Sequence, residues 1–445
     1  MSTITNISEK EVGRINQNKI REKIHELIKE YFAQREKEEF IPGKTKIGVG
    51  FPCYGHEEII SAVDSLLNLF LSQGEKVAKF EREFSNYIGS KHGVAVNSGS
   101  SANLLALSAL LKTDRVKPRS EVIVPAATFT TVVSPILQNG LIPTFVDADR
   151  ETYNMDPEEI KKAINENTGL IMVVHSFGCP ADMKEIMKIA KKNEIPVMED
   201  CCEAHGASID GKKVGTFGLI STYSFFVAHN MTTGEGGIIV TDDEELERML
   251  RSIREFGRLR DVDVNKPRFY YTDAWLKEYD ERYVFENIGY NVRMTDLAAS
   301  LGIEQLKKLD SLNKIRVEIT NYFTDRLKKY EEYLQLPMVP ENCFHSFYGY
   351  VILVKEKTPF SRGDIVRFLE QHKIETRAFM GGNLALQPAY RNENIKIIGD
   401  LKNTVKIMNN AFFIGCHPYI DEVQREYVVF TFDKFFENYL KYPED

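Results

Sequence analysis

Residues 221–243 read STYSFFVAHNMTTGEGGIIVTDD, and this segment decides how the rest of the chain is interpreted. An apolar run over residues 223–228 leads into a polar turn that begins at His229. A glycine-rich stretch, residues 232–237, then precedes a second apolar run that starts at Ile238. Two apolar runs around a glycine-rich turn predict a strand, a tight loop and a second strand.

Short apolar segments alternate with helical patterns on the N-terminal side of this segment. From Val94 onward they read VAV, EVIVP, LIPTFVD, LIMVVH and IPVMED. One helix start is well marked, because Asp156 is a favourable N-cap, Pro157 suits the first helical position and Glu159 supplies an acidic third residue. The alternation predicts an α/β fold with a large, mixed and mostly parallel sheet covered by helices on both faces.

A chain of 445 residues exceeds what a single hydrophobic core usually organises. Apolar residues at helical spacing near the N-terminus predict an amphipathic helix there. Beyond Gly289 the alternation gives way to a long helical pattern and a few further elements. We therefore expect an N-terminal helical extension over residues 1–45, a large domain over 46–310 and a small α+β domain over 311–445.

Composition excludes several classes of function. The formal charge is −8 without a cluster of basic residues, which argues against a nucleic-acid partner. The six cysteines include no Cys-x-x-Cys pair, so neither a zinc site nor a disulfide framework is expected. No window is apolar enough for a membrane span, and the N-terminus has no hydrophobic targeting segment. We expect a cytoplasmic protein.

A Gly-Ser turn follows the strand at residues 94–96. Gly99, Ser100 and Ser101 open the helix LLALSALL. Free N–H groups and the positive end of the helix dipole suit such a turn to a phosphate, although an ordinary N-cap reads the same way.

Two further residues stand where parallel strands end. Asp200 closes the strand IPVM, and Phe129 follows the strand EVIVP. Ligands sit at this edge of parallel sheets, and burying an unpaired carboxylate is costly unless it has a partner. Taken alone, Phe129 would be assigned to the core.

Together these segments resemble the DegT/DnrJ/EryC1/StrS family of sugar aminotransferases, which use pyridoxal phosphate (PLP) and have fold type I. In that family a lysine just before Asn-x-Thr-Thr-Gly-Glu-Gly-Gly binds the cofactor covalently. Here this position is His229, which cannot form that link. The chain therefore resembles the nucleotide-sugar 3-dehydratase branch, and SGSSANLLALSAL, QNGLIPTFVD, EDCCEAHG and FFIGCHP read as that branch.

The resemblance assigns roles residue by residue. Gly99, Ser100, Ser101 and Ser224 would hold the cofactor phosphate. Phe129 would stack on the pyridine ring, Asp200 would face the ring nitrogen, and Glu203 would face the phenolic oxygen. Asn291 would reach the phosphate of a neighbouring subunit, which implies a homodimer with shared active sites. Arg377 would meet the phosphates of a sugar nucleotide.

Other candidates near the loop receive structural interpretations. Lys212 and Lys213 match a surface hairpin of the family and are not expected to replace the missing lysine. His175 and His205 lie near strand ends, where hydrogen-bonded structural histidines are the expected reading.

The chain departs from the cluster-containing members of this branch. Those CDP-4-keto-6-deoxy-hexose 3-dehydrases carry a [2Fe-2S] cluster on four thiolates. Cys202 matches the first ligand, but LRDVDVNKPRFYY replaces the Cys-x-Cys-x7-Cys run, and no cysteine lies between Cys202 and Cys343. We expect no iron-sulfur cluster, as in the GDP-4-keto-6-deoxymannose 3-dehydratases that the chain also resembles.

The resemblance implies C3 dehydration of a nucleotide-linked 4-keto-6-deoxy sugar in dideoxysugar synthesis for surface polysaccharide. L-glutamate would convert non-covalently bound PLP to pyridoxamine phosphate (PMP), and His229 would act as the acid–base group. Three alternatives stay open: a cluster-free dehydratase that needs a separate reductase, a sugar aminotransferase, and an idle relative that only binds cofactor or sugar. The nucleotide, GDP or CDP, and the choice between hexose and heptose also stay open.

Overall fold

The computed structural model describes residues 9–35, 39–259, 270–273 and 277–441. Its main sheet has eight strands in the order β1-β9-β8-β5-β4-β2-β3-β16. The strands are β1 (His92–Val96), β2 (Glu121–Pro125), β3 (Ile142–Val146), β4 (Thr168–Val174), β5 (Val197–Asp200), β8 (Ile220–Ser224), β9 (Gly237–Thr241) and β16 (Lys396–Ile397). All pairs from β8 to β16 are parallel, whereas β9 runs antiparallel to β8 and β1. The predicted mixed, mostly parallel sheet is confirmed.

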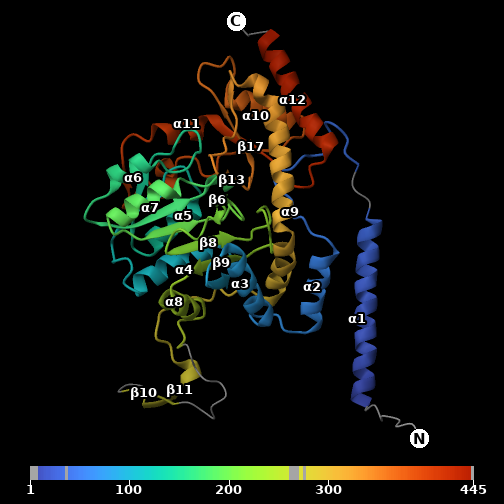
Figure 1. Cartoon of the computed structure of the whole chain (residues 1–445), viewed down its shortest axis with the longest axis vertical. Coiled ribbons are helices and arrows are strands. Elements are labelled where there is room, and N and C mark those ends of the chain that lie inside the picture. Colours follow the sequence, from blue (N-terminus) through green and yellow to red (C-terminus); the bar gives the residue numbers. More distant parts are fainter. Residues whose placement is uncertain (1–8, 36–38, 260–269, 274–276, 442–445) are drawn as a thin grey trace.

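Helices cover both faces of this sheet (Figure 1). Val122 and Val124 of β2 pack in the core with α4 and α5, whereas the intervening Ile123 packs with α6 and α7. This alternation follows from the period of two along a strand. Asp156 accepts a hydrogen bond from the N–H of Glu158 at the start of α6, as its capping pattern predicts. The covering helices are α3 (Glu75–Ile88), α4 (Gly99–Lys112), α5 (Thr130–Gln138), α6 (Pro157–Ala163), α7 (Met183–Lys192) and α8 (Glu244–Arg254).

The long helix α9 (Asp296–Leu327) runs beside the main sheet and continues along a second, smaller sheet (Figure 1). The predicted boundary at residue 311 falls inside this continuous helix. The C-terminal elements are β12 (Leu334–Gln335), β14 (Tyr350–Val354), α10 (Arg362–Gln371), β15 (Thr376–Ala378), α11 (Lys402–Asn410), β17 (Ala411–Ile414) and α12 (Glu422–Lys441). The small sheet has the order β12-β14-β17-β15, so this part is α+β as expected.

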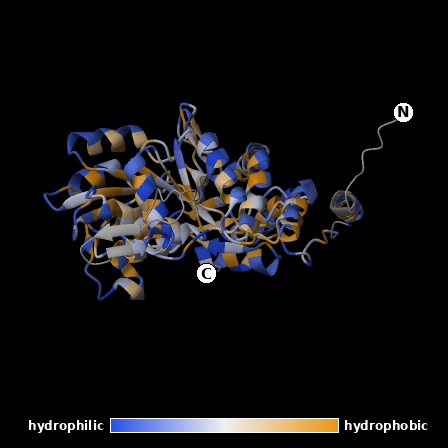
Figure 2. Ribbon diagram, turned by 90° about the horizontal axis from the view of Figure 1, so that it is seen from below, coloured by the Kyte–Doolittle hydropathy of each residue, from blue (hydrophilic) through white to orange (hydrophobic). Residues whose placement is uncertain are grey.

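The expected N-terminal helix is α1 (Glu9–Gln34), which lies beside α2 (His56–Leu67) at the margin of the molecule (Figures 1 and 2). Nε of Arg21 lies 3.0 Å from Oδ1 of Asp64 and ties the two helices together. Figure 2 shows apolar residues concentrated in the interior of the main body. No helix in the described ranges is both long and apolar enough to cross a bilayer.

Two small sheets complete the described chain. The strands β6 (Ser208–Ile209), β7 (Lys212–Lys213) and β13 (Cys343–Phe344) form one of them. The hairpin β10 (Tyr270–Asp273) and β11 (Lys277–Asp280) projects away from the body (Figure 1).

Candidate active site

A cavity of about 440 Å³ opens where the strands β5 and β8 end. Its wall combines the turn before α4, the start of α5, the ends of β4, β5 and β8, and segments that follow β8 and precede β14. The lining residues are Ser98, Gly99, Ser100, Thr128, Phe129, Thr131, Val132, Val174, Asp200, Cys202, Glu203, Ser224, Phe226, His229, Glu235, Tyr348 and Met380. Seven of the ten predicted site residues therefore face one cavity.

The predicted phosphate turn forms one end of this cavity. Ser98 caps α4, and its Oγ accepts a hydrogen bond from the N–H of Ser101 at 3.1 Å. A β-carbon at Gly99 would lie 2.5 Å from Cβ of Ser224, so only glycine fits against the end of β8. Ser101 is not on the wall, and its hydroxyl donates to Oδ1 of Asn97 at 2.7 Å. Ser101 therefore shapes the turn from outside.

Asp200 is buried at the end of β5 and is held in one orientation. Nδ2 of Asn103 donates to its Oδ2 at 2.7 Å, and the N–H of Cys202 donates to its Oδ1 at 3.0 Å. Asn103 is fixed in turn because its Oδ1 accepts from the hydroxyl of Thr222 at 2.7 Å. The sequence analysis missed Asn103, which lies one helical turn after Gly99 and faces inward.

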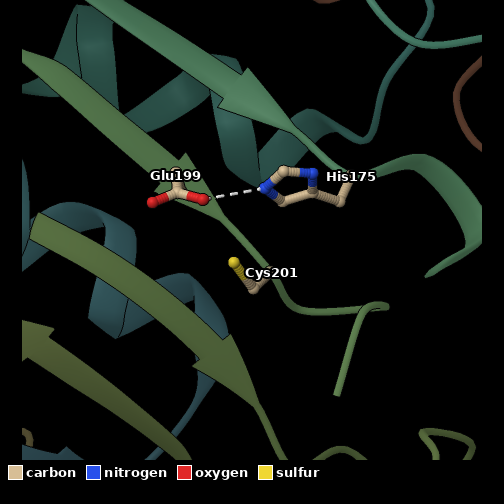
Figure 3. A group of neighbouring side chains, drawn as sticks. All are labelled: His175, Glu199 and Cys201. Carbon is tan, nitrogen blue, oxygen red and sulfur yellow. Dashed lines mark hydrogen bonds and ion pairs between the residues drawn. The ribbon is translucent and has the colours of Figure 1, made fainter. Parts of the chain in front are cut away.

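The neighbouring carboxylate, Glu199, points away from the cavity into a buried group with His175 and Cys201 (Figure 3). Nδ1 of His175 accepts from the N–H of Ala181 at 3.0 Å, so Nε2 carries the proton and donates to Glu199 at 3.1 Å. Glu199 also accepts the N–H groups of Gly215, Phe217 and Gly218. These bonds occupy both ring nitrogens of His175 and both oxygens of Glu199, so His175 is the hydrogen-bonded buried histidine that the sequence analysis expected.

Glu203 lies on the cavity wall and accepts a hydrogen bond from the N–H of Phe177 at 2.8 Å. Burial raises the pKa of Glu203 to about 8, and the negative charge of Asp200 acts in the same direction. The N–H of Phe177 opposes this shift only in part. At neutral pH the side chain is therefore a neutral acid that can donate a hydrogen bond into the cavity.

His229 lies in the cavity wall, and its ring contacts three other rings. The ring centroids of Tyr348, His205 and Phe226 lie 5.2, 5.9 and 6.2 Å from that of His229. Burial, together with the nearby charge of Arg316, lowers the pKa of His229 to about 3. The ordinary imidazole pKa near 6.5 therefore does not hold in the folded chain, and the imidazole is neutral.

His205 differs from the hydrogen-bonded structural histidine that was expected. It is fully buried behind His229, and neither ring nitrogen makes a well-formed hydrogen bond in the described chain. Burial and the adjacent His229 lower the pKa of His205 well below its ordinary value. The sequence did not indicate this contact, because His205 and His229 are far apart along the chain and only the fold brings their rings together.

Phe129, Lys212 and Lys213 were also singled out from the sequence. Phe129 precedes α5 and is 53% exposed, so it covers the cavity and is not a core residue. Lys212 and Lys213 lie against the rings of Phe217 and Tyr87, and among the residues that the structure describes no lysine lines the cavity. Lys212 and Lys213 thus lie on a hairpin, as predicted, and neither brings an amine into the cavity.

Asn291 and Arg377 do not line the cavity of their own chain. Asn291 is exposed on a loop that bonds to the phosphate turn, because the N–H of Asn97 donates to the carbonyl of Val292 at 2.9 Å. Arg377 is half exposed on β15, where its guanidinium contacts the carboxylate of Glu375. Residues 260–269, most of the segment that replaces the cysteine run, lie outside the described residues.

Comparison with known proteins gives the family. Residues 53–433 match the DegT/DnrJ/EryC1/StrS aminotransferase family. The lipopolysaccharide biosynthesis protein RfbH of Salmonella typhimurium is 36% identical over 94% of this chain and 98% of its own length. A GDP-4-keto-6-deoxy-D-mannose 3-dehydratase of Yersinia pseudotuberculosis is 36% identical over 84% of this chain and 95% of its own length.

Solved structures agree with these relatives. A GDP-4-keto-6-deoxymannose-3-dehydratase crystallised with a trapped PLP-glutamate geminal diamine has a TM-score of 0.79 and 33% identity, and covers 86% of this chain and 99% of its own. The fold is therefore that of the PLP-dependent transferases of fold type I. The chain belongs to the DegT/DnrJ/EryC1/StrS aminotransferase family.

The cavity fits the cofactor of this family. The N-terminus of α4 with Ser224 forms a cradle for a phosphate, which only a glycine at position 99 leaves open. Asp200 offers a fixed carboxylate for a protonated ring nitrogen. Oγ1 of Thr128 is enclosed beside the cavity, has no hydrogen-bond partner among the described residues, and can serve a bound group.

Proposed function

We propose that the protein is a PMP-dependent 3-dehydratase of a nucleotide-linked 4-keto-6-deoxy sugar, with L-glutamate as the amino donor. One observation carries the proposal: a neutral histidine, His229, occupies the lysine position and lines a cavity otherwise suited to PLP. A family member without that lysine lacks the group that recaptures the cofactor during amino transfer. Proton transfer is what an imidazole retains.

The overall reaction balances without an external reductant. Glutamate is oxidised to 2-oxoglutarate and ammonia, and its two electrons replace the C3 hydroxyl of the sugar by hydrogen. When bound, the cofactor carries the amino group to the C4 ketone and acts as the electron sink. This balance is why an iron-sulfur cluster is not needed, and its absence stays a prediction.

Different residues of the cavity would bind different parts of the cofactor. The N–H groups at the start of α4 and the hydroxyl of Ser224 would hold the cofactor phosphate. Asp200 would keep the pyridine nitrogen protonated, and Phe129 would cover the ring. Glu203, neutral at pH 7, would donate a hydrogen bond to the phenolic oxygen.

His229 would move the proton. Its Nδ1 is enclosed and has no hydrogen-bond partner in the described chain, which leaves Nε2 for catalysis. Nε2 would accept a proton as general base and return it to the departing C3 hydroxyl. A conjugate acid with a low pKa is a strong proton donor to a poor leaving group, which favours the second step.

The homodimer with shared active sites is supported by the position of Asn291. This side chain is exposed, lies outside its own cavity, and sits on a loop bonded to the phosphate turn. Phe226 and Val227, at the cavity mouth and beside it, are 43% and 39% exposed, which suits a surface covered by a second copy. Arg377 would meet the nucleotide phosphates once freed from Glu375.

Relatives suggest the pathway and location. The relatives named above include a lipopolysaccharide biosynthesis protein and a GDP-sugar dehydratase. Synthesis of a nucleotide-linked dideoxysugar for surface polysaccharide in the cytoplasm fits both. The experiment described next determines which sugar and which nucleotide the protein uses.

The test is a panel of GDP- and CDP-linked 4-keto-6-deoxy sugars incubated with the PLP-loaded protein and L-glutamate. We expect 2-oxoglutarate, ammonia and a 3-deoxy sugar in equal amounts. Product that forms only with a reductase and NAD(P)H would favour the reductase-dependent dehydratase. An aminated sugar would show an aminotransferase, and no turnover of either substrate would show an idle relative.

A further inference from the structure

Behind the imidazole of His229, α9 presents two buried polar side chains three residues apart, Asn313 and Arg316. Residues at this spacing share one face of a helix. Nδ2 of Asn313 donates to the carbonyl of His205 at 2.8 Å, and its Oδ1 accepts from Nδ2 of Asn230 at 2.8 Å. The loop that carries His229 is therefore tied to α9 through the next residue along the chain.

Arg316 anchors the opposite side of the site. It is 2% exposed, and one guanidinium nitrogen donates to the carbonyls of Phe347 and Tyr348 at 3.2 and 3.3 Å. Sγ of Cys416 lies 3.8 Å from the same nitrogen. No carboxylate in the described ranges forms an ion pair with this side chain. Burying a cation without a counter-ion costs stability, which these acceptors only partly offset.

The main chain that Arg316 holds is strained. Phe347 has a φ of 48°, and Phe177, which faces it, has a φ of 54°. Non-glycine residues adopt this left-handed region only when their surroundings fix them there. The N–H of Tyr348 donates to the carbonyl of Phe177 at 2.8 Å, and the N–H of Phe177 donates to Glu203 at 2.8 Å. A chain of hydrogen bonds thus links a cavity acid to Arg316.

We infer that Arg316 is a positioning residue, which fixes the ring of Tyr348 against the imidazole of His229. Tyr348 lines the cavity, and its ring centroid lies 5.2 Å from that of His229. The inference rests on the proposed function only in taking His229 as the acid–base group. It adds Arg316 as the residue that fixes the position of that imidazole.

The charge of Arg316 has a second effect at the same place. It opposes protonation of both His229 and His205, and so keeps the imidazole of His229 neutral. The other titratable groups around this ring are His205, Tyr348 and, on the cavity wall, Asp200, Cys202, Glu203 and Glu235. Arg316 lies outside the cavity wall, so PLP or substrate would not need to contact it.

Two substitutions separate position from charge. Arg316→Lys keeps a cation but replaces the rigid planar guanidinium, one nitrogen of which contacts both carbonyls, by an ammonium on a shorter and more flexible stem, whereas Arg316→Met removes the charge at similar length. We expect kcat for dehydration to fall about 10- to 100-fold in both, with KM little changed, because a displaced acid–base group costs rate more than binding. Tyr350→Phe is the matched control, since that hydroxyl bonds Thr324 on the side away from the cavity.

A second readout needs neither cofactor nor substrate. NMR titration of the histidine ring carbons in the purified protein, with the His229 signal identified by its absence in His229→Asn, reports on the imidazole directly. We expect His229 to gain its proton at higher pH in Arg316→Met than in the native protein and in Arg316→Lys. An unchanged titration in Arg316→Met, or native kcat in folded Arg316→Lys, overturns the inference.

Two results keep this test separate from the proposed function. If the Arg316 variants do not fold, Tyr348→Leu removes the same contact from the other side, and native kcat in that variant overturns the inference. If His229→Asn dehydrates the sugar at the native rate, the proposed base is wrong. The titration still decides whether Arg316 sets the state of that imidazole.

Discussion

The side-chain amide of Asn103 donates a 2.7 Å hydrogen bond to Oδ2 of Asp200, and both groups are buried. The bond crosses from the second turn of α4, the helix whose N-terminus carries the phosphate cradle, to the end of β5. The two ends of the proposed cofactor site are therefore set relative to each other by one interaction. A change at Asn103 should be felt in cofactor binding without any contact to substrate.

We predict that Asn103→Leu weakens PLP binding about 10- to 100-fold, the loss expected for one hydrogen bond to a charged group. Without the donor, the carboxylate of Asp200 loses the side-chain hydrogen bond that fixes its Oδ2. Fluorescence titration with PLP measures the affinity. Asn139→Leu, a change on the loop after α5 outside the cavity, is the control. Native affinity in Asn103→Leu would show that Asp200 is held by the backbone alone.

His229→Asn should retain cofactor and sugar but lose dehydration by roughly 10² to 10⁴-fold, as expected for a missing acid–base group. His229→Lys should restore a covalent, borohydride-trappable link to PLP that the native protein lacks, and shift the product toward an amino sugar. Mass spectrometry of the reduced proteins checks the link. Dehydration by His229→Asn at close to the native rate would transfer the role to another group, with His205 or Glu203 examined first.

Glu203 should set the alkaline limit of activity. Its pKa of about 8 means that it can donate a hydrogen bond below that pH and loses the proton as the pH rises through it. Turnover should therefore fall between about pH 7 and 9, and Glu203→Gln, which keeps a donor at every pH, should flatten that limb. A pH–rate profile of both proteins decides it. An identical alkaline limb in the variant would exclude Glu203 as its cause.

Asn291 should act on the site of a second copy. An Asn291→Ala variant and a His229→Asn variant are each expected to be nearly inactive. If subunits exchange and sites are shared, an equal mixture of the two should regain about a quarter of native activity, because half of the dimers are mixed and each mixed dimer has one intact site. Two copies of the same variant, taken through the same exchange, serve as the control. Verified mixed dimers without recovery would place both residues in one chain's site.

Acid should destabilise the protein through its buried histidines. Burial lowers the pKa of His229 and His345 to about 3 and that of His417 to about 4. Between these values and about 6.5 the unfolded chain binds more protons than the folded one, so the free energy of unfolding falls as pH falls through this window. Melting temperatures should drop from pH 7 to 4.5, and the drop should be less steep in His345→Asn than in the control His56→Asn, whose side chain is partly exposed. Equal slopes would contradict the assignment.

Local sequence patterns were enough for the sheet and for much of the site. Strand alternation and helix caps depend on neighbouring residues, and parallel strands deliver their carboxyl ends to one edge. Gly99, Asp200 and the strand end before Phe129 could therefore be placed at one edge from the chain order, whereas Ser224 and the role of Phe129 came from the resemblance to the family. The sequence also determined what chemistry His229 forbids, because an imidazole cannot replace the lysine amine.

Tertiary structure decided the state of those groups. Tyr348 lines the cavity from the segment before β14, whereas Asn103 in α4 and Arg316 in α9 act on it through Asp200 and Tyr348, and no local period marks such contacts. The pKa of His229 follows from burial and from a guanidinium 87 residues further along the chain, so a reference value could not supply it. Electrostatics and desolvation depend on distances that only the folded chain sets.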